Sequence, residues 1–207
     1  MDATNVKFWS RYATIYDFEI NNISKDAYNE MYRLMSSVLK KDMDVLEVAT
    51  GTGLIATHIA GYVKSVIATD FSRGMIEKAK KKPRLENLQF SIEDATALSF
   101  PNDKFDAVII SNALHIMPNP EAALANIKRV LKPNGLLIAP NFSHGHLRGK
   151  SWNLSAAILK LFGFVAYSKW LPAEYVQFIS LNGFSVDKWM VLKAAFPLVY
   201  LQARNLD

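Results

Sequence analysis

The sequence predicts an α/β fold: a doubly wound, mostly parallel sheet of about seven strands, with helices on both faces and an antiparallel hairpin at its C-terminal edge. Short apolar runs alternate with helical patterns along most of the chain, which is typical of parallel strands joined by crossover helices. The last two apolar runs, 186–194 and 198–203, are separated by a few residues around Pro197, so they can pair only antiparallel. With 207 residues and no linker-like stretch, the chain is predicted to form a single domain, 1–207.

Each element follows from a local pattern of apolar residues. Two helical patterns occupy the N-terminal segment 1–40, at 7–17 and 24–39. Short continuous apolar runs predict buried strands at 45–49, 65–69, 88–92, 107–111 and 136–139. Apolar residues at helical spacing predict helices at 54–61, 73–82, 120–131 and 173–181. Ser72 can cap the helix at 73–82, and a turn at Pro133-Asn134-Gly135 precedes the strand at 136–139.

Composition excludes several classes of protein. Half of the residues are hydrophobic, which excludes a disordered chain, and the absence of cysteine excludes disulfides and is compatible with the cytoplasm. No apolar run reaches the roughly 20 residues that a membrane-spanning helix needs. The net charge is +5, but the densest basic run, 78–82, is expected to solvate a helix end, so no nucleic-acid partner is expected. His144 and His146 have no third ligand nearby, so no metal site is expected.

The stretch "EVATGTG" (47–53) lies between a predicted strand and a predicted helix, where a glycine-rich turn lets the backbone approach a ligand closely. Gly51-x-Gly53-x-x-Ala56 fits the dinucleotide fingerprint of Rossmann-like sheets, and Asp70 follows Gly51 by 19 residues. An NAD-dependent oxidoreductase is therefore one hypothesis. The same pattern fits any other adenosine ligand in this crevice.

Three features favour S-adenosylmethionine over NAD. Glu47, at the end of the first strand, would repel a pyrophosphate but suits the ammonium group of an amino acid. Asp94, after the third strand, can accept a hydrogen bond from the adenine amino group. The chain also has no second domain of the size that a dehydrogenase uses for its substrate. S-adenosylmethionine joins adenosine to an amino acid, is cationic at sulfur and has no phosphate, so it fits all three features.

Across nearly its whole length the chain resembles the class I S-adenosylmethionine-dependent methyltransferases. The stretches "VLEVATGTG", "ATDFS", "EDATALSFPNDKFDAVIISNALH" and "RVLKPNGLLI" are similar to the motifs of that family, in the same order and spacing. The nearest subgroup is the ubiquinone/menaquinone-biosynthesis type, some members of which also have alanine where this chain has Ala49. A methyl group is thus expected to be tolerated there, while Gly51 and Gly53 make the close approach. The subgroup usually has arginine and asparagine where this chain has His115 and Ile116, which argues against a quinone acceptor.

The resemblance implies a cofactor-binding set of Tyr16, Glu47, Ala49, Gly51, Thr52, Gly53, Asp70, Phe71, Met75, Asp94, Ala95, Ser111 and Asn112. In this set Asp70 is implied to bind both ribose hydroxyls of the cofactor. Its alternative role is to cap the predicted helix at 73–82. Asp94 and the backbone of Ala95 are implied to meet the adenine, and the alternative for Asp94 is a solvated surface carboxylate.

The remaining members of the set have less specific roles. Glu47 is implied to anchor the ammonium group directly or through water. Gly51, Thr52 and Gly53 are implied to line the methionine portion of S-adenosylmethionine with backbone groups. Phe71 and Met75 can flank the adenine, although a methionine at helical spacing is more often core. Tyr16 can close over the cofactor or pack on the sheet edge. Ser111 and Asn112 follow the fourth strand, where open parallel sheets bind ligands.

His115 is the candidate catalytic residue because it lies beside the predicted point of methyl transfer. As a general base it can take a proton from a hydroxyl nucleophile; alternatively it caps a helix or fills the pocket wall. Methyl transfer from a sulfonium is an in-line displacement that depends mainly on alignment in a dry cavity, so few obligatory catalytic residues are expected.

The insert at 142–170 is expected to cover the substrate. It is rich in large apolar and aromatic side chains, and Arg148, Lys150 and Lys169 lie at its margins. This composition favours a small apolar, aromatic or lipid-like methyl acceptor. It also favours a peripheral contact of the insert with a membrane surface. The alternative to that contact is that the insert packs on the domain. A non-catalytic protein that binds S-adenosylmethionine and an NAD-dependent oxidoreductase are the alternative functions.

Overall fold

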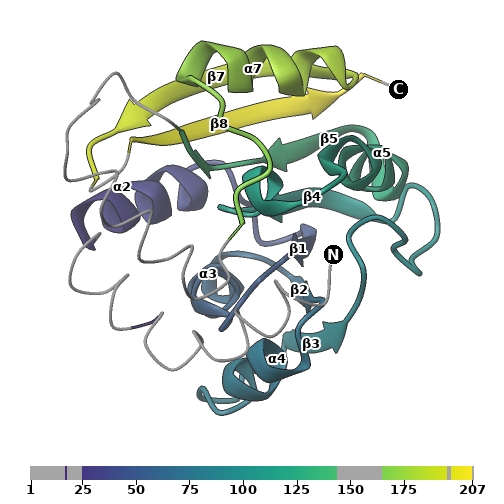
Figure 1. Ribbon diagram of the computed structural model, residues 1–207. Helices are drawn as coiled ribbons and strands as arrows, with labels where there is room; N and C mark the ends of the chain where they lie inside the picture. The colour runs from purple at the N-terminus through teal and green to yellow at the C-terminus, as the bar shows by residue number, and fades with distance from the viewer. Residues whose placement is uncertain (1–16, 18–24, 144–164, 195–196, 207) are drawn as a thin grey trace.

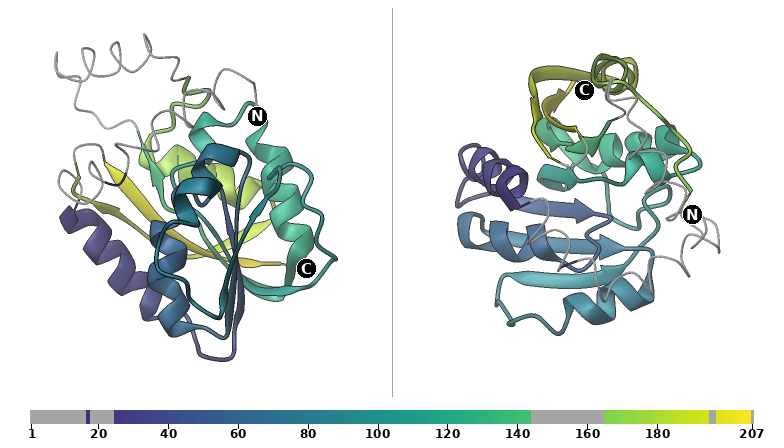
Figure 2. Two further views of the ribbon diagram at one scale, coloured as in Figure 1. Left: turned by 90° about the horizontal axis from the view of Figure 1, so that it is seen from below. Right: turned by 60° about the vertical axis from the view of Figure 1, so that its left-hand side comes forward.

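The computed structural model describes residues 17, 25–143, 165–194 and 197–206, and within them an eight-stranded sheet is covered by helices on both faces (Figures 1 and 2). The strands are β1 (Asp44–Val48), β2 (Ser65–Asp70), β3 (Leu88–Ile92), β4 (Phe105–Ile110), β5 (Leu131–Ile138), β6 (Asn141–Phe142), β7 (Phe184–Leu192) and β8 (Leu198–Asn205). The helices are α2 (Lys25–Ser36), α3 (Leu54–Ile59), α4 (Arg73–Ala79), α5 (Pro120–Val130) and α7 (Pro172–Leu181), with 3-10 turns η1 (Ala60–Tyr62) and η2 (Leu114–Ile116). The first predicted helical pattern, 7–17, lies outside the described residues except for Asp17.

The sheet has the predicted α/β topology. The strands run in the order β3-β2-β1-β4-β5-β8, and β1 to β5 pair in parallel. The hairpin of β7 and β8 is antiparallel and joins the sheet through β5. The mostly parallel fold with an antiparallel C-terminal hairpin is therefore confirmed.

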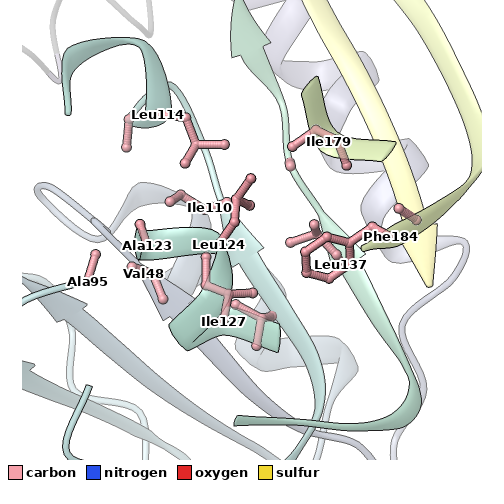
Figure 3. Close-up of a cluster of buried hydrophobic side chains, with 14 of the residues drawn as sticks. Val48, Ala95, Ile110, Leu114, Ala123, Leu124, Ile127, Leu137, Ile179 and Phe184 are labelled. Carbon is pink, nitrogen blue, oxygen red and sulfur yellow. The ribbon is translucent and has the colours of Figure 1, made fainter. Parts of the chain in front are cut away.

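Two buried cores lie on opposite faces of the sheet, because successive side chains of a strand point to opposite sides. Val45 of β1 packs in the core that includes α2 and α3, whereas Leu46 and Val48 belong to the core that includes α5 and α7. Figure 3 shows the second core, in which Ile127 of α5 and Ile179 of α7 lie on the same face of the sheet. The unbroken apolar run of β1 follows from this burial on both faces.

One strand was not predicted. The two-residue β6 continues β5 beyond Ala139 along the same side of β8, in unbroken register from Leu136 opposite Arg204 to Phe142 opposite Leu198. β7 pairs with the other side of β8 and forms the outer strand of the hairpin. The extension matters for function because it carries the chain past the carboxyl end of β4.

The predicted turn at 133–135 interrupts β5 and does not precede it. β5 already begins at Leu131, and the residues expected to turn lie within it as an irregularity, with Asn134 at a φ of 58° and a shift in register between Phe105 and Ala107 of β4. Helix α4 ends at Ala79, so the three lysines predicted to close it lie beyond its end. Within the described part of the chain, no helix has the length and apolar character needed to cross a membrane.

Candidate functional site

The site lies at the carboxyl ends of the parallel strands. The chain runs outward from β1 to β2 and β3, then returns to place β4 on the other side of β1. The connections after β1 and β4 therefore leave the sheet in opposite directions, and a crevice opens between them where such sheets bind ligands. The predicted loop 49–53 follows β1, and Ser111, Asn112 and His115 follow β4.

The loop after β1 has three residues with positive φ: Ala49 (55°), Gly51 (58°) and Gly53 (77°). A Cβ atom added at Gly51 would meet nothing within 4 Å, whereas one at Gly53 would lie 2.7 Å from Cε1 of Phe90. Gly51 thus faces open space, as expected for a close approach to a ligand. The prediction for Gly53 needs correction, because its close approach is to Phe90 of β3. Ala49 adopts the left-handed conformation despite its methyl group, which costs about 1–2 kcal/mol.

These two glycines give a paired prediction. Gly51→Ala is expected to lower the free energy of unfolding by about 1–2 kcal/mol, which is the cost of a left-handed alanine. Gly53→Ala adds a clash with Phe90, so the total loss is expected to reach about 2–5 kcal/mol. Urea denaturation measures both, with Gly61→Ala as the control, since Gly61 has neither a positive φ nor a neighbour within 4 Å of an added Cβ. Equal losses at Gly51 and Gly53 would contradict this assignment.

Asp70 joins the loop after β1 to the loop after β2. Its Oδ2 accepts a hydrogen bond from the amide of Gly51 and its Oδ1 from the amide of Ser72, both at 2.8 Å. Burial raises the pKa of Asp70 to about 6, and the two amides act in the opposite direction. Ser72 itself caps α4, because its hydroxyl accepts from the amide of Met75. Each carboxylate oxygen can accept a second hydrogen bond, so Asp70 can hold this turn and still receive two hydroxyl donors.

Glu47 lies beneath the same loop and is 1% exposed. The hydroxyl of Thr50 donates to its Oε2 at 2.6 Å. Burial raises the pKa of Glu47 to about 8, while the hydrogen bonds from Thr50 and from the backbone of Ala56 lower it and the charge of Asp70 raises it further. Among the described residues no lysine or arginine forms an ion pair with Glu47. A cation brought close to Glu47 would therefore be strongly favoured.

The raised pKa of Glu47 predicts a pH-dependent effect on stability. The folded protein holds this proton up to a pH of about 8, whereas an unfolded glutamate loses it near 4.3, so stability falls as the pH rises between about 4 and 8. Glu47→Gln is expected to leave the free energy of unfolding nearly unchanged at pH 5, and to increase it at pH 8.5. Urea denaturation at both values measures the difference, and the exposed Glu121→Gln serves as control. A loss of stability at pH 8.5 would mean that the buried carboxylate is already stabilised in the free protein.

A hollow opens beside the loop. Its lining consists of Ala49, Phe71, Glu93, Asp94, Ala95, Thr96, Met117 and Pro118. The structure thus brings together Phe71, Asp94 and Ala95, the residues predicted for the adenine. Met75 is 2% exposed and does not line the hollow, which agrees with the alternative interpretation of this methionine as core.

Asp94 presents an ionised acceptor at this hollow. Its Oδ1 accepts from the amide of Thr96 at 2.9 Å and from the hydroxyl of the same residue at 2.8 Å. Burial raises the pKa of Asp94, but these two hydrogen bonds, with other nearby charge, outweigh it and hold the pKa below its usual range. Asp94 is half-buried and keeps one side toward the hollow, so its role at the adenine and its alternative role as a solvated surface acid both stay predictions.

Ser111 and Asn112 differ in what they offer a ligand. The Oγ of Ser111 is buried and has no hydrogen-bond partner within the described structure. Asn112 is already engaged: its Nδ2 donates to the hydroxyl of Tyr28 at 2.9 Å, and its Oδ1 accepts from the amide of Phe142 at 3.0 Å. Asn112 therefore joins α2 and β6 to the end of β4. The Oγ of Ser111, in contrast, is a buried polar atom that a ligand could engage.

His115 lies in η2 and is held from two sides. Its Nδ1 is 2.9 Å from Oδ1 of Asn141, and its backbone carbonyl accepts from the amides of Tyr167 and Ser168 at 2.9 and 3.1 Å. The C-terminal end of the predicted insert, 165–170, contacts this corner and is not helical. The rest of the insert, 144–164, lies outside the described residues, as does Tyr16.

Two site residues escaped the sequence analysis. Asn141 is 1% exposed and bonded to His115. Asp17 accepts a hydrogen bond from the hydroxyl of Thr52 and pairs with Nζ of Lys82 at 2.6 Å. The terminal lysine of the basic run thus forms an ion pair and does not merely solvate a helix end. No group of three metal-ligating side chains occurs within the described ranges.

Comparison with known proteins agrees with this geometry. Residues 46–139 match the family described as "Methyltransferase domain". This match covers just under half of the chain. Over its whole length the same fold occurs in a chain of the complex between the Haloferax volcanii Trm112 methyltransferase activator and a methyltransferase, with a TM-score of 0.79, 16% identity, and coverage of 96% of this chain and 98% of that one.

Proteins similar in sequence to this chain include two named enzymes. A demethylmenaquinone methyltransferase of Renibacterium salmoninarum is 44% identical over 100 residues, which are 48% of this chain and 41% of the relative. The ubiquinone/menaquinone biosynthesis C-methyltransferase UbiE of Shewanella pealeana is 31% identical over 141 residues, 63% of this chain and 56% of the relative. The chain thus spans about half the length of these relatives, and the family match at 46–139 includes the site residues after β1 and β2.

Proposed function

We propose that the chain is an S-adenosylmethionine-dependent methyltransferase that moves a methyl group in line onto a small apolar or aromatic acceptor. The observation that carries this proposal is the pair of carboxyl groups, Glu47 and Asp70, on either side of the open backbone at Gly51. A buried carboxyl group without a cationic partner favours an ammonium group, and a carboxylate at the tip of β2 favours a ribose diol. NAD has no ammonium group to offer Glu47, and its pyrophosphate would oppose ionisation of this carboxyl group.

Each side chain then has a distinct task. S-adenosylmethionine, when bound, supplies a methyl group on a positively charged sulfur. Asp70 accepts the ribose hydroxyls, Asp94 and Ala95 meet the adenine in the hollow, and Glu47 receives the ammonium group. The buried Oγ of Ser111 gains a partner from the ligand, which removes the cost of a lone buried hydroxyl. His115 lies on the acceptor side and takes the proton that the acceptor loses.

The acceptor is proposed to be a hydroxylated aromatic ring. The two relatives are named for enzymes of menaquinone and ubiquinone biosynthesis, which favours a hydroxylated aromatic ring, while His115 and Ile116 depart from that subgroup and argue against the quinone itself. The histidine at 115, in place of the arginine of that subgroup, favours an acceptor whose hydroxyl proton must be removed. Acceptors of this kind are small and apolar, as the aromatic composition of the insert predicts.

Two measurements test the proposed function. Calorimetry should show binding of S-adenosylmethionine and its demethylated product and no binding of NAD; the reverse result would overturn the proposal in favour of an oxidoreductase. Mass spectrometry should then detect a product heavier by one methylene after incubation with naphthoquinols or simple phenols, with thiols and amines as comparison acceptors. Tight cofactor binding without methylation of any acceptor would favour the non-catalytic alternative.

A further inference from the structure

A buried asparagine lies directly behind the candidate base. Asn141 of β6 is 1% exposed, and its side chain makes two hydrogen bonds. Its Oδ1 is 2.9 Å from Nδ1 of His115, and its Nδ2 donates to the carbonyl of Phe142 at 3.0 Å. None of the motifs in the sequence contains this residue, and the imidazole is the only side chain to which its oxygen is bonded in the described structure.

The second of these hydrogen bonds fixes the orientation of the amide. A backbone carbonyl can only accept, so the Asn141 atom that contacts Phe142 must be the nitrogen, and the atom that faces His115 must be the oxygen. An amide oxygen also only accepts, so Nδ1 of His115 carries the proton. In the neutral imidazole, Nε2 is then the basic nitrogen.

The asparagine is itself held firmly in place. Its backbone pairs with Val199 of β8, and the amide of the next residue, Phe142, donates to Asn112 at the end of β4. Both the amide and the carbonyl of Phe142 are therefore bonded to asparagine side chains from the site. Rotation of the Asn141 amide would lose its hydrogen bond to Phe142 and bring the amide oxygen against the carbonyl of Phe142.

We infer that Asn141 is a positioning residue that keeps His115 in the Nδ1–H tautomer, with Nε2 as the atom that receives the proton of the methyl acceptor. The inference rests on the proposed function for its catalytic part only. A histidine without such a partner prefers to carry its proton on Nε2, which would leave Nδ1, on the Asn141 side, as the basic nitrogen. Tautomers of histidine are set in this way by the hydrogen bond that the other ring nitrogen makes.

Nitrogen NMR of the whole protein, without cofactor or acceptor, tests the tautomer. The imidazole ¹⁵N resonances of His115 are assigned by their loss in His115→Gln, and the pattern of the wild type should be that of Nδ1–H at a pH where the ring is neutral. Asn141→Ala should shift the population toward Nε2–H. Asn141→Asp retains an oxygen that accepts from Nδ1, so it should keep the Nδ1–H form and raise the pH at which His115 titrates.

Kinetics test the catalytic part. Asn141→Ala should lower kcat by at least about 10-fold, up to the full loss of about 10²–10⁴ that general-base catalysis accounts for, while the Kd for the cofactor stays within about two-fold. Asn141→Asp should recover most of kcat, and its pH–rate profile should shift with the titration of His115. A wild-type ring in the Nε2–H form would overturn the inference even if Asn141→Ala failed to fold. If Asn141→Ala changed the tautomer but left kcat unchanged, the positioning role would be overturned. If the wild-type protein transferred no methyl group at all, the proposed function would be overturned, but the NMR result on the tautomer would still hold.

Discussion

Replacing His115 by alanine is expected to lower kcat by about 10²–10⁴-fold, while the affinity for S-adenosylmethionine stays close to that of the wild type. The reason is the proposed position of the ring: it follows β4 in η2 and bonds Asn141, and it is not among the residues proposed to hold the cofactor. Loss of the imidazole therefore removes a proton acceptor without removing a cofactor contact. Product formation measured by mass spectrometry gives kcat, and calorimetry gives the Kd.

The pH–rate profile adds a second criterion for His115. A general base must be unprotonated, so the wild-type rate should fall on the acidic side as the ring takes up a proton, and this limb should vanish in His115→Ala. His58→Ala is the matched control, since His58 on α3 stacks on Tyr32 with ring centroids 4.3 Å apart and bonds Ser36, outside the crevice. If kcat fell by less than 10-fold and the acidic limb of the profile remained, His115 would not be a general base and would only form part of the pocket wall.

The fold could be predicted because its main determinants are local. A parallel strand buried on both faces must be an uninterrupted apolar run, and β1, β2 and β4 appear in the sequence as such runs. β6 could not be found in this way, because two residues have no periodicity and exist as a strand only by pairing with β8. The proline and glycine at 133–135 do interrupt the pairing of β5 with β4, which passes from Leu131 directly to Leu136, but the start of the strand before them depends on the contact of Leu131 with Phe105.

The residues of the candidate site could be predicted where they lie at a fixed number of residues from the end of a strand. Asp70 and the loop glycines follow directly from strand ends, and the structure joins Asp70 to Gly51 at 2.8 Å. Asn141 lies 26 residues from His115 and meets it only because β6 extends past β4. The role of Gly53 was also hidden, because its neighbour Phe90 comes from a strand two positions away in the sheet. Contacts of this kind depend on packing across the sheet, which no short motif encodes.

Removal of the Asp70 carboxylate is expected to weaken binding of S-adenosylmethionine and of its demethylated product strongly. Each hydrogen bond from a ribose hydroxyl to a charged acceptor contributes about 1.5–3 kcal/mol, so Asp70→Ala should raise the Kd by about 10- to 150-fold for each bond lost. Asp70 also accepts from the amides of Gly51 and Ser72, so part of the loss could arise from the loop itself. Asp70→Asn keeps the size of the side chain and an oxygen for one of these amides, and its free energy of unfolding shows whether the turn is intact.

A truncated ligand separates the ribose contact from the ammonium contact. 5′-Methylthioadenosine retains the adenosine but has no amino acid portion, so it can use Asp70 but not Glu47. Asp70→Ala should therefore weaken calorimetric binding of both S-adenosylhomocysteine and methylthioadenosine, whereas Glu47→Gln should weaken only the former. The buried position of Glu47 beneath Thr50 makes Glu47→Gln a conservative change, because the amide oxygen can still accept the hydroxyl of Thr50. If Asp70→Ala left the affinity for methylthioadenosine unchanged, the carboxylate would serve only to join Gly51 to Ser72, and the ribose would have to bind elsewhere in the crevice.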